Sequence, residues 1–345
     1  MSEVAVSEGQ GDRDSSRILA AGLAILGWLV KFVMVVVVIA TVNFMLVHAA
    51  PGDPAQVMAG QSGAADEKLL AQLRADYGLD KPYPIQLASY LGRVLTLDLG
   101  YSYRQQRPVR DLILERLPAT LLLTATAFVA ALIIGVMLGL FAGVRAGRWS
   151  DTFITVLSLL MYATPVFWLG LMLVLLFSVK LDWLPAFGYV TIGVEMSPLQ
   201  RIGDIAAHLV LPATSLAAIY LAIYARLTRA SVIEVMHQDF IKTARAKGLT
   251  QGRIIARHIL RNAILPVVTV AGMQAGALVG GAVVIETVFA WPGLGRLIYD
   301  ALLQRDYPVM LGIFLVMSVI VIMLNLLTDA IYRVIDPRVS MRAAS

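Results

Sequence analysis

The sequence has 345 residues, a formal net charge of +5, a hydrophobic fraction of 59% and a mean hydropathy of +0.77. This composition is too apolar for a protein that closes around one core in water, so a bilayer is the expected solvent. The absence of cysteine excludes disulfides, thiolate metal sites and cysteine nucleophiles.

Six stretches of at least 21 residues contain no Asp, Glu, Lys or Arg, which indicates membrane-spanning helices. A hydrocarbon core about 30 Å thick requires roughly 20 apolar residues per helix. A helix also satisfies its own backbone hydrogen bonds where lipid offers no partner. We therefore predict an all-α, polytopic membrane protein with six transmembrane helices. The uncharged stretches are 32–52, 117–144, 152–179, 205–225, 262–285 and 307–328.

The N-terminal region is predicted to be a cytoplasmic tail over 1–18, followed by the first transmembrane helix over 19–47. The first 17 residues are hydrophilic and no A-x-A-like site closes the apolar stretch, so we expect no cleaved signal peptide. Lys31 interrupts this apolar region. An intramembrane ion pair is one interpretation, but a side chain that snorkels to the lipid head groups is the favoured one.

The segment 48–116 is predicted to be external and to fold as helices. Residues 66–77 repeat leucine at helical spacing, and Gly78 follows where a helix C-terminal cap belongs. A second amphipathic run covers 84–97. The two helices would form a small cap on the external face.

The remaining chain, 117–335, is predicted to form a core of five transmembrane helices. Pro118 suits the first turn of the second span, where its missing N–H costs nothing. Pro165 interrupts the third span and Pro212 lies early in the fourth, so we expect kinks there. Such kinks suit a pore, but ordinary membrane helices also carry them.

The basic residues set the expected orientation, because short cytoplasmic loops carry an excess of Lys and Arg. The loop 226–261 holds eight basic residues, whereas the short loops 180–204 and 286–306 hold two each. We therefore expect both termini in the cytoplasm, including the tail 336–345.

A short helix is predicted within the cytoplasmic loop 228–262. Asp239 is expected as its N-cap, the helix runs over 240–247, and Gly248 follows its C-terminus. A two-turn helix is unstable alone in water. It must therefore dock onto something, and a cytoplasmic partner is the obvious candidate. The residues that would share its apolar face are Phe240, Ile241 and Ala244.

Thr250 can cap a second helix that carries a basic stripe. Arginines recur on it at four-residue steps, next to an isoleucine face. An anchor bound to lipid phosphates is the alternative explanation of the arginines, but it does not require two short helices separated by glycine. The stripe consists of Arg253, Arg257 and Arg261, and the apolar face of Ile254, Ile255 and Ile259.

An isolated carboxylate, two aromatic residues and a Pro-Gly turn lie just outside the fifth span. Such a stretch allows a compact, irregular plug where the backbone leaves the apolar core, so we predict an external gate. An interfacial belt that holds the aromatic rings at head-group level is the equally weighted alternative. The gate candidates are Glu286, Thr287, Phe289, Trp291, Pro292 and Gly293.

No sequence signature of catalysis is present. The chain lacks a G-x-x-x-x-G-K-[ST] phosphate loop and a G-x-S-x-G nucleophile elbow, and its four histidines show no metal-binding spacing. We therefore expect no enzyme activity, cofactor, metal or nucleic-acid partner for this chain. An ion-coupled transporter is a rival, but its carboxylates would be Glu286 and Asp329, which lie at the ends of apolar stretches. A purely structural scaffold is a third option without positive evidence.

Several motifs together resemble the permease subunits of ABC importers, and most closely those for dipeptides and oligopeptides. The run 239–249, Asp-Phe-Ile-Lys-Thr-Ala-Arg-Ala-Lys-Gly-Leu, with Arg-Asn-Ala-Ile-Leu-Pro at 261–266, is similar to the EAA loop of that family. Three further motifs extend the resemblance over nearly the whole chain. They are Pro-Gly-Asp-Pro at 51–54, Glu-Thr-Val-Phe-Ala-Trp-Pro-Gly-Leu-Gly at 286–295 and Asp-Pro-Arg at 336–338.

The resemblance implies a type I importer in a bacterial cell membrane. Two related permeases would stand side by side, with two cytoplasmic ATPases that bind ATP and Mg, and an external solute-binding protein. The short helix would be the coupling helix, which ATP-driven closure of the ATPases moves as a lever to switch the pore. Its docking residues would be Asp239, Phe240, Ile241, Thr243, Ala244, Arg245, Ala246, Lys247 and Gly248.

Short peptides are the cargo that the resemblance implies first. The same subfamily also includes importers of haem, nickel chelates, glutathione and oligosaccharides. A wide, mostly apolar pore with few fixed charges would conduct many of these solutes. Specificity would then lie largely in the binding protein.

Overall fold

The computed structural model of this chain describes Gly27, Val30, 32–46, Ala55, 67–78 and 80–335. Those residues are predominantly helical and form two compact units. The first unit comprises the described residues up to Leu99 together with Phe314–Val319. The second comprises Gly100–Ile313 and the described residues from Ile320 onward. The two predicted tails lie outside the described residues.

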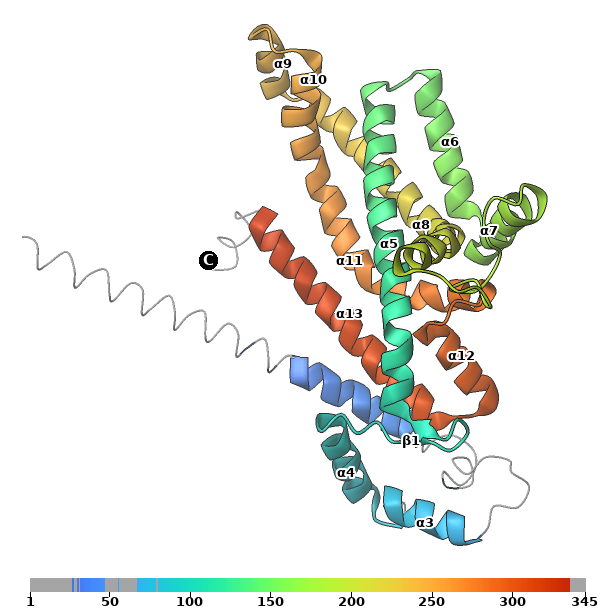
Figure 1. Ribbon diagram of the computed structural model, residues 1–345. Helices are drawn as coiled ribbons and strands as arrows, with labels where there is room; N and C mark the ends of the chain where they lie inside the picture. Colours follow the sequence, from blue (N-terminus) through green and yellow to red (C-terminus); the bar gives the residue numbers. More distant parts are fainter. Residues whose placement is uncertain are drawn as a thin grey trace, which may run out of the picture. The chain divides into compact units, whose positions relative to one another are not determined.

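The first unit contains an apolar helix, Phe32–Leu46, and the two helices predicted for the external segment. α3 spans Glu67–Tyr77 and α4 spans Tyr83–Leu95 (Figure 1). Gly78 has a φ of +63°, which confirms it as the left-handed residue that ends α3. The core of this unit consists of Ala40, Val94 and Leu315, with Tyr90 and Leu91 packed against it.

The second unit contains a two-stranded antiparallel hairpin and the remaining helices (Figure 1). In the hairpin, Tyr101 pairs with Pro108 and Ser102 pairs with Arg107. The elements in chain order are β1 (Tyr101–Ser102), β2 (Arg107–Pro108), α5 (Val109–Val144), α6 (Trp149–Ala163), α7 (Val166–Leu173), the π-helix η1 (Val174–Lys180), α8 (Pro198–Met236), α9 (Asp239–Ala246), α10 (Gln251–Ile254), the π-helix η2 (Ile255–Ile259), α11 (Leu260–Val288), α12 (Leu294–Gln304) and α13 (Tyr307–Ile335).

Four of the described helical runs are long and apolar enough to cross a membrane: α5, α8, Gln251–Leu278 and Tyr307–Thr328. A fifth crossing results if α6 and α7 with η1 form one span, because these helices are bent by 109° at a short break. Pro165 lies at this break and has no N–H to continue α6, so the predicted kink is confirmed. The third span is therefore not one straight helix. Phe32–Leu46 is shorter than a full span, and the count of six stays a prediction.

The prediction that Pro118 opens the second span is wrong. α5 begins at Val109 after Pro108, and Pro118 lies inside the helix. The cause is the amphipathic stretch before Pro118, in which Val109, Leu112 and Ile113 are buried. Their packing maintains the helix although the proline removes one backbone hydrogen bond.

Three glycines at four-residue spacing bring α5 against α8. A Cβ added to Gly135, Gly139 or Gly143 would lie 2.9, 2.4 or 2.7 Å from the nearest atom of α8. Small residues at this spacing let two membrane helices approach closely and pack through their backbones. The α5–α8 pair therefore forms a rigid centre for the second unit.

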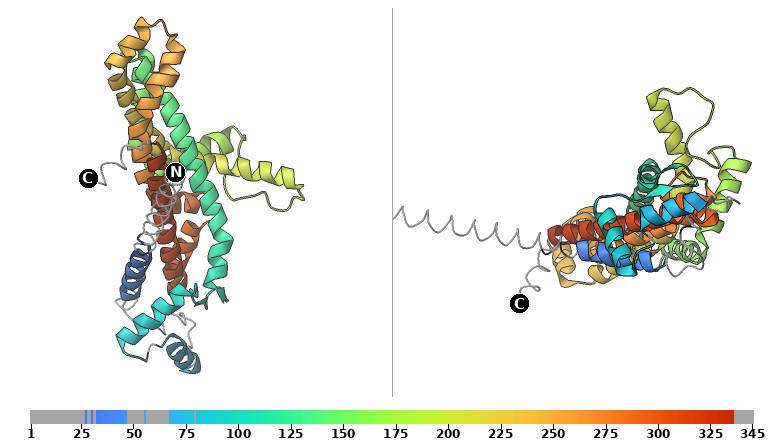
Figure 2. Two further views of the ribbon diagram at one scale, coloured as in Figure 1. Left: turned by 90° about the vertical axis from the view of Figure 1, so that its left-hand side faces the viewer. Right: turned by 90° about the horizontal axis from the view of Figure 1, so that it is seen from below.

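Within the second unit, α9 and α10 lie at one end of α5, and β1 and α12 lie toward its other end (Figure 1). Turned views show that the first turns of α8 project sideways from this unit (Figure 2). Leu199 and Ile202 on those turns are 80% and 65% exposed. The two sequence-predicted sites are thus separated along the length of α5.

Candidate functional sites at the two ends of the second unit

The predicted coupling helix is present as α9, but its start differs by one residue from the prediction. Gln238 occupies the N-cap position without a side-chain hydrogen bond, and Asp239 is the first helical residue. The N-cap prediction for Asp239 is therefore wrong. Its carboxylate contacts Lys242 at 2.8 Å on the exposed surface instead of the backbone. As an acidic residue in the first turn, it still complements the positive end of the helix dipole.

The C-terminus of α9 is closed by a Schellman motif. The N–H of Gly248 donates to the carbonyl of Arg245 at 2.9 Å, and the N–H of Leu249 donates to the carbonyl of Ala244 at 3.3 Å. Gly248 has a φ of +74°, and a Cβ added there would meet nothing within 4 Å. The backbone conformation alone therefore requires glycine. The predicted cap at Gly248 is confirmed.

The inner face of α9 packs against the chain's own helices. Ile241 and Ala244 are 0% and 5% exposed, and they share an apolar cluster with residues of α8, α10, η2 and α11. Phe240 is 43% exposed, so the prediction that it shares their face is wrong. The partner that makes this short helix stable is thus the same chain. The other members of the cluster are Val232, Ile254, Ile259 and Ala263.

The outer face of α9 is exposed and carries three basic residues, Lys242, Arg245 and Lys247. Beside it, Thr250 occupies the predicted N-cap position of α10, although its side chain makes no cap hydrogen bond. Ile254 and Ile259 are buried, while the predicted arginine stripe is exposed. This end of the unit therefore presents a rigidly held, positively charged surface. Its exposed residues include Phe240, Lys242, Thr243, Arg245, Ala246, Lys247, Arg253, Arg257 and Arg261.

A partly buried ion pair joins two helices next to this surface. Asp151, in the first turn of α6, is 3% exposed and accepts hydrogen bonds from Nε and Nη2 of Arg229 on α8, the second at 2.8 Å. The same carboxylate accepts the N–H of Gly147 at 2.9 Å. This bidentate contact holds α6 against α8. The sequence gives no local signal for it, because the partners are 78 residues apart.

At the other end of the unit, Glu286 is fully buried and accepts hydrogen bonds from two different helices. Thr120 Oγ1 of α5 donates to Oε1 at 2.7 Å, and the N–H of Arg296 donates to Oε2 at 3.0 Å. The N–H of Gly295 also bonds to this carboxyl. Because Gly295 and Arg296 lie in the first turn of α12, Glu286 caps that helix from α11.

Thr120 completes this buried network, which we name the Glu286 knot: Glu286, Thr120 and the first turn of α12. The Thr120 hydroxyl accepts the N–H of Leu294 at 2.7 Å, so its single proton is free to point at Glu286. Gly293 is required here because an added Cβ would lie 2.3 Å from the Glu286 carboxyl. The knot therefore ties the α11–α12 turn to α5.

The aromatic gate candidates are interior residues. Trp291 is 0% exposed and donates Nε1–H to the carbonyl of Ala119 at 2.9 Å, and Phe289 is 1% exposed. The carbonyl of Phe289 accepts the N–H of Gly188 at 2.9 Å. An interfacial belt would leave both rings at the surface. Burial excludes that alternative, because both rings pack in the core of the unit.

The remaining gate candidates line the same turn. The Thr287 hydroxyl donates to the carbonyl of Val283 in its own helix at 2.8 Å. Pro292 follows Trp291, whose N–H closes the turn onto the carbonyl of Glu286 at 2.8 Å. All six candidates thus lie in the last residues of α11 or in the turn that follows it. That the turn opens and closes remains a prediction.

A second polar contact lies near this end. Ser102 of β1 donates to the carboxylate of Asp306, which is 3% exposed at the junction of α12 and α13. Burial raises the pKa of the Asp306 carboxyl, and the Ser102 hydrogen bond opposes that shift. The polar contacts of Glu286 and of Asp306 both hold helices in position. Among the residues that the structure describes, no group of three His, Asp or Glu side chains could hold a metal ion.

Two family matches along the chain describe the same kind of membrane protein. Residues 135–341 match the family described as binding-protein-dependent transport system inner membrane component. Residues 25–124 match the N-terminal region described for such membrane components. Together the matches include α9 and the Glu286 knot.

Curated relatives are similar over most of the chain. The dipeptide transport system permease protein DppB of Escherichia coli (strain K12) is 42% identical, covering 87% of this chain and 94% of the relative. The protein of the same name from Alkalihalophilus pseudofirmus is 38% identical, covering 90% and 97%. A putative peptide transport system permease protein of Brucella abortus is 41% identical, covering 88% and 95%.

Among solved structures, a chain of the MetNI methionine ABC transporter in an inward-facing conformation resembles this fold. The TM-score is 0.52 at 19% sequence identity, covering 65% of this chain and 96% of that chain. At this identity the likeness concerns the fold alone.

Proposed function

Since the chain belongs to the family of binding-protein-dependent transport system inner membrane components, we propose that it forms part of a pore for short peptides. It is a multi-pass, non-catalytic permease subunit of an ABC importer, and separate ATPase subunits hydrolyse ATP. The observation that carries the peptide assignment is the 42% identity to a dipeptide permease across 94% of that protein's length.

The outer face of α9 docks onto an ATPase subunit in this proposal. Support comes from the way α9 is held: Ile241 and Ala244 are buried in the chain's own cluster, while Arg245 and Lys247 remain exposed. A helix that packs against its own chain on one side and is exposed on the other can transmit a displacement to that chain without unfolding. Movement of the ATPase would therefore pass to α8 and α11, which both contribute to the same cluster.

A second, homologous permease faces the exposed side of α11 in this proposal. On that side, residues at steps of four, three and four are exposed and small or apolar, whereas the opposite face is buried. The two small residues in the middle of this stripe, Ala277 and Gly280, leave room for a neighbouring membrane helix. The exposed stripe consists of Met273, Ala277, Gly280 and Val284.

Orientation and cofactors complete the proposal. The excess of basic residues around α9 supports a cytoplasmic position for this end of the unit by the positive-inside rule, and the proposal has both termini on that side. The Glu286 knot then lies toward the external side, where a binding protein delivers its solute. ATP and Mg bind to the partner ATPases, and this chain needs no cofactor of its own.

The peptide assignment predicts a specific response of the purified importer. The intact complex in lipid vesicles should hydrolyse ATP severalfold faster with its binding protein loaded with a dipeptide or oligopeptide than with the empty protein. The physical reason is that a loaded binding protein shifts the two-state equilibrium that α9 couples to the ATPases. The measurement is phosphate release with a panel of solutes.

The same panel separates the alternatives. Haem, a nickel chelate, glutathione and an oligosaccharide serve as the competing solutes, each offered with the same binding protein. Stimulation by one of these and by no peptide would refute the peptide cargo but leave the importer function intact.

A further inference from the structure

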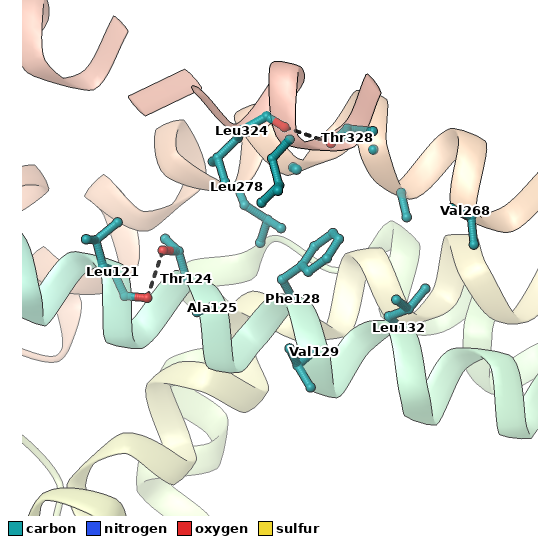
Figure 3. Close-up of a pocket in the computed structure, with 14 residues that line it drawn as sticks. Leu121, Thr124, Ala125, Phe128, Val129, Leu132, Val268, Leu278, Leu324 and Thr328 are labelled. Atoms are coloured by element: carbon teal, nitrogen blue, oxygen red, sulfur yellow. Dashed lines mark hydrogen bonds between the residues drawn. The ribbon is translucent and has the colours of Figure 1, made fainter. Parts of the chain in front are cut away.

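An apolar cavity of about 460 Å³ lies between α5, α11 and α13, within the second unit (Figure 3). Phe128 of α5 projects into the space between the helices, and Leu324 and Thr328 approach it from α13 (Figure 3). On α11 the wall is made of small residues, among them Ala271 and Ala275. The site predictions from the sequence do not include this cavity.

The side chains that line the cavity offer no free hydrogen-bond donor to water or a polar solute. Twelve of the fourteen lining residues have apolar side chains or are glycine, and the other two are threonines. Thr124 donates its hydroxyl proton to the carbonyl of Thr120 at 2.8 Å, and Thr328 donates to the carbonyl of Leu324 at 2.8 Å. A buried water needs two to four polar partners, so this cavity either stays dry or holds hydrocarbon. It is equally unsuited to a zwitterionic peptide.

The cavity cannot close by bringing α11 and α13 together. A Cβ added to Gly272 would lie 1.7 Å from Cγ2 of Thr328, and one added to Gly276 would lie 2.8 Å from Cγ1 of Val321. The two helices are therefore already in backbone-limited contact. The space beside that contact is a fixed feature of the packing.

Size decides between a protein helix and a lipid chain as the occupant. An apolar cavity of about 150 Å³ binds one benzene molecule, which has six carbon atoms. By that comparison, a cavity of about 460 Å³ takes roughly 18 carbon atoms, the size of one acyl chain. A membrane-spanning helix of about 20 residues contains far more atoms, so the cavity cannot enclose one.

We propose that the cavity between α5, α11 and α13 binds one fatty acyl chain of a membrane phospholipid. The protein is surrounded by such chains because it is a multi-pass membrane protein. An acyl chain there contacts the face of α11 that carries Ala271 and Ala275. It would therefore support the helix that links the α9 cluster to the Glu286 knot.

Photolabelling of the whole importer tests this proposal. The complex is reconstituted in vesicles of phosphatidylcholine with a diazirine in one acyl chain, irradiated and digested, and the adducts are located by mass spectrometry. Counted per residue, we expect at least threefold more adducts on the α5 residues that line the cavity than on the exposed Ile133, Ile134 and Met137 of the same helix. The cavity-lining set is Leu121, Thr124, Ala125, Phe128, Val129 and Leu132. The mass of the adduct includes the phosphocholine head group, which distinguishes a phospholipid from a free fatty acid.

Two filling variants sharpen the test. Ala125→Phe, at the exposed lip, and Ala275→Phe, in the wall, should each reduce cavity adducts at least fivefold. Ala206→Phe makes the same change at an exposed position of α8 outside the cavity and should leave them unchanged. Equal labelling of the cavity-lining and the exposed residues of α5 would overturn the proposal, and so would an unchanged number of cavity adducts in both filling variants. Either result would follow if a protein segment filled the cavity.

Discussion

Replacing Gly248 by valine is expected to reduce solute uptake by at least about fivefold while the importer still assembles. Gly248 has a φ of +74° and closes the Schellman motif of α9. A β-branched residue held in this conformation costs about 1–3 kcal/mol, and each 1.4 kcal/mol is a factor of ten. The strain would unwind the end of α9 and displace its outer face. Uptake of labelled substrate by cells and ATP hydrolysis by the purified complex measure the effect.

Gly252→Val is the matched control. Gly252 is also exposed, a Cβ added there would meet nothing within 4 Å, and its φ is not positive. Valine there should leave uptake near the level of the unchanged protein, since glycine is the poorer helix former. If both variants transport equally well, the geometry of α9 has no part in coupling.

Replacing Glu286 by glutamine is expected to destabilise the importer and loosen the α11–α12 turn. Three donors converge on the carboxyl of Glu286: the Thr120 hydroxyl and the N–H groups of Gly295 and Arg296. A glutamine amide has only one acceptor oxygen, so its NH₂ group would face a donor. A buried unsatisfied polar group costs about 1–3 kcal/mol. Thermal unfolding of the purified complex should therefore begin at a lower temperature.

Two substitutions at Thr120 separate hydrogen bonding from packing. Thr120→Val keeps the shape but removes the hydroxyl that joins Glu286 to Leu294, so it should reproduce much of the Glu286→Gln effect. Thr120→Ser keeps the hydroxyl and should be milder. A Thr287→Cys reporter should react faster with an external thiol reagent in the loosened variants. Unchanged stability and labelling in Glu286→Gln would show that the knot does not hold the turn.

Local signals explain what the sequence predicted well. Gly78 and Gly248 each follow an amphipathic run, and a left-handed glycine is a short-range property of the chain. The break at Pro165 is local for the same reason. The prediction failed by one residue at Asp239, because Asp is favoured both at the N-cap and in the first helical turn.

Two other misses, the exposure of Phe240 and the bond between Thr120 and Glu286, come from contacts between distant residues. The exposure of Phe240 depends on where α8, α10 and α11 pack against α9, which no local pattern reveals. Thr120 and Glu286 are 166 residues apart, so their hydrogen bond could not be predicted. The glycine spacing at 135, 139 and 143, by contrast, is a signal for close helix packing that the sequence itself carries.

Site-specific cross-linking determines whether the outer face of α9 contacts an ATPase subunit. The chain has no cysteine, so Ala246→Cys on α9 introduces a single thiol at an exposed position. Leu302→Cys on α12 is the control at the other end of the second unit, where the residue is 57% exposed. A short thiol-reactive cross-linker applied to the purified importer should join the ATPase subunit to position 246 and not to position 302. An ATPase adduct at position 302, or none at position 246 in an active complex, would show that the ATPase does not dock on the outer face of α9.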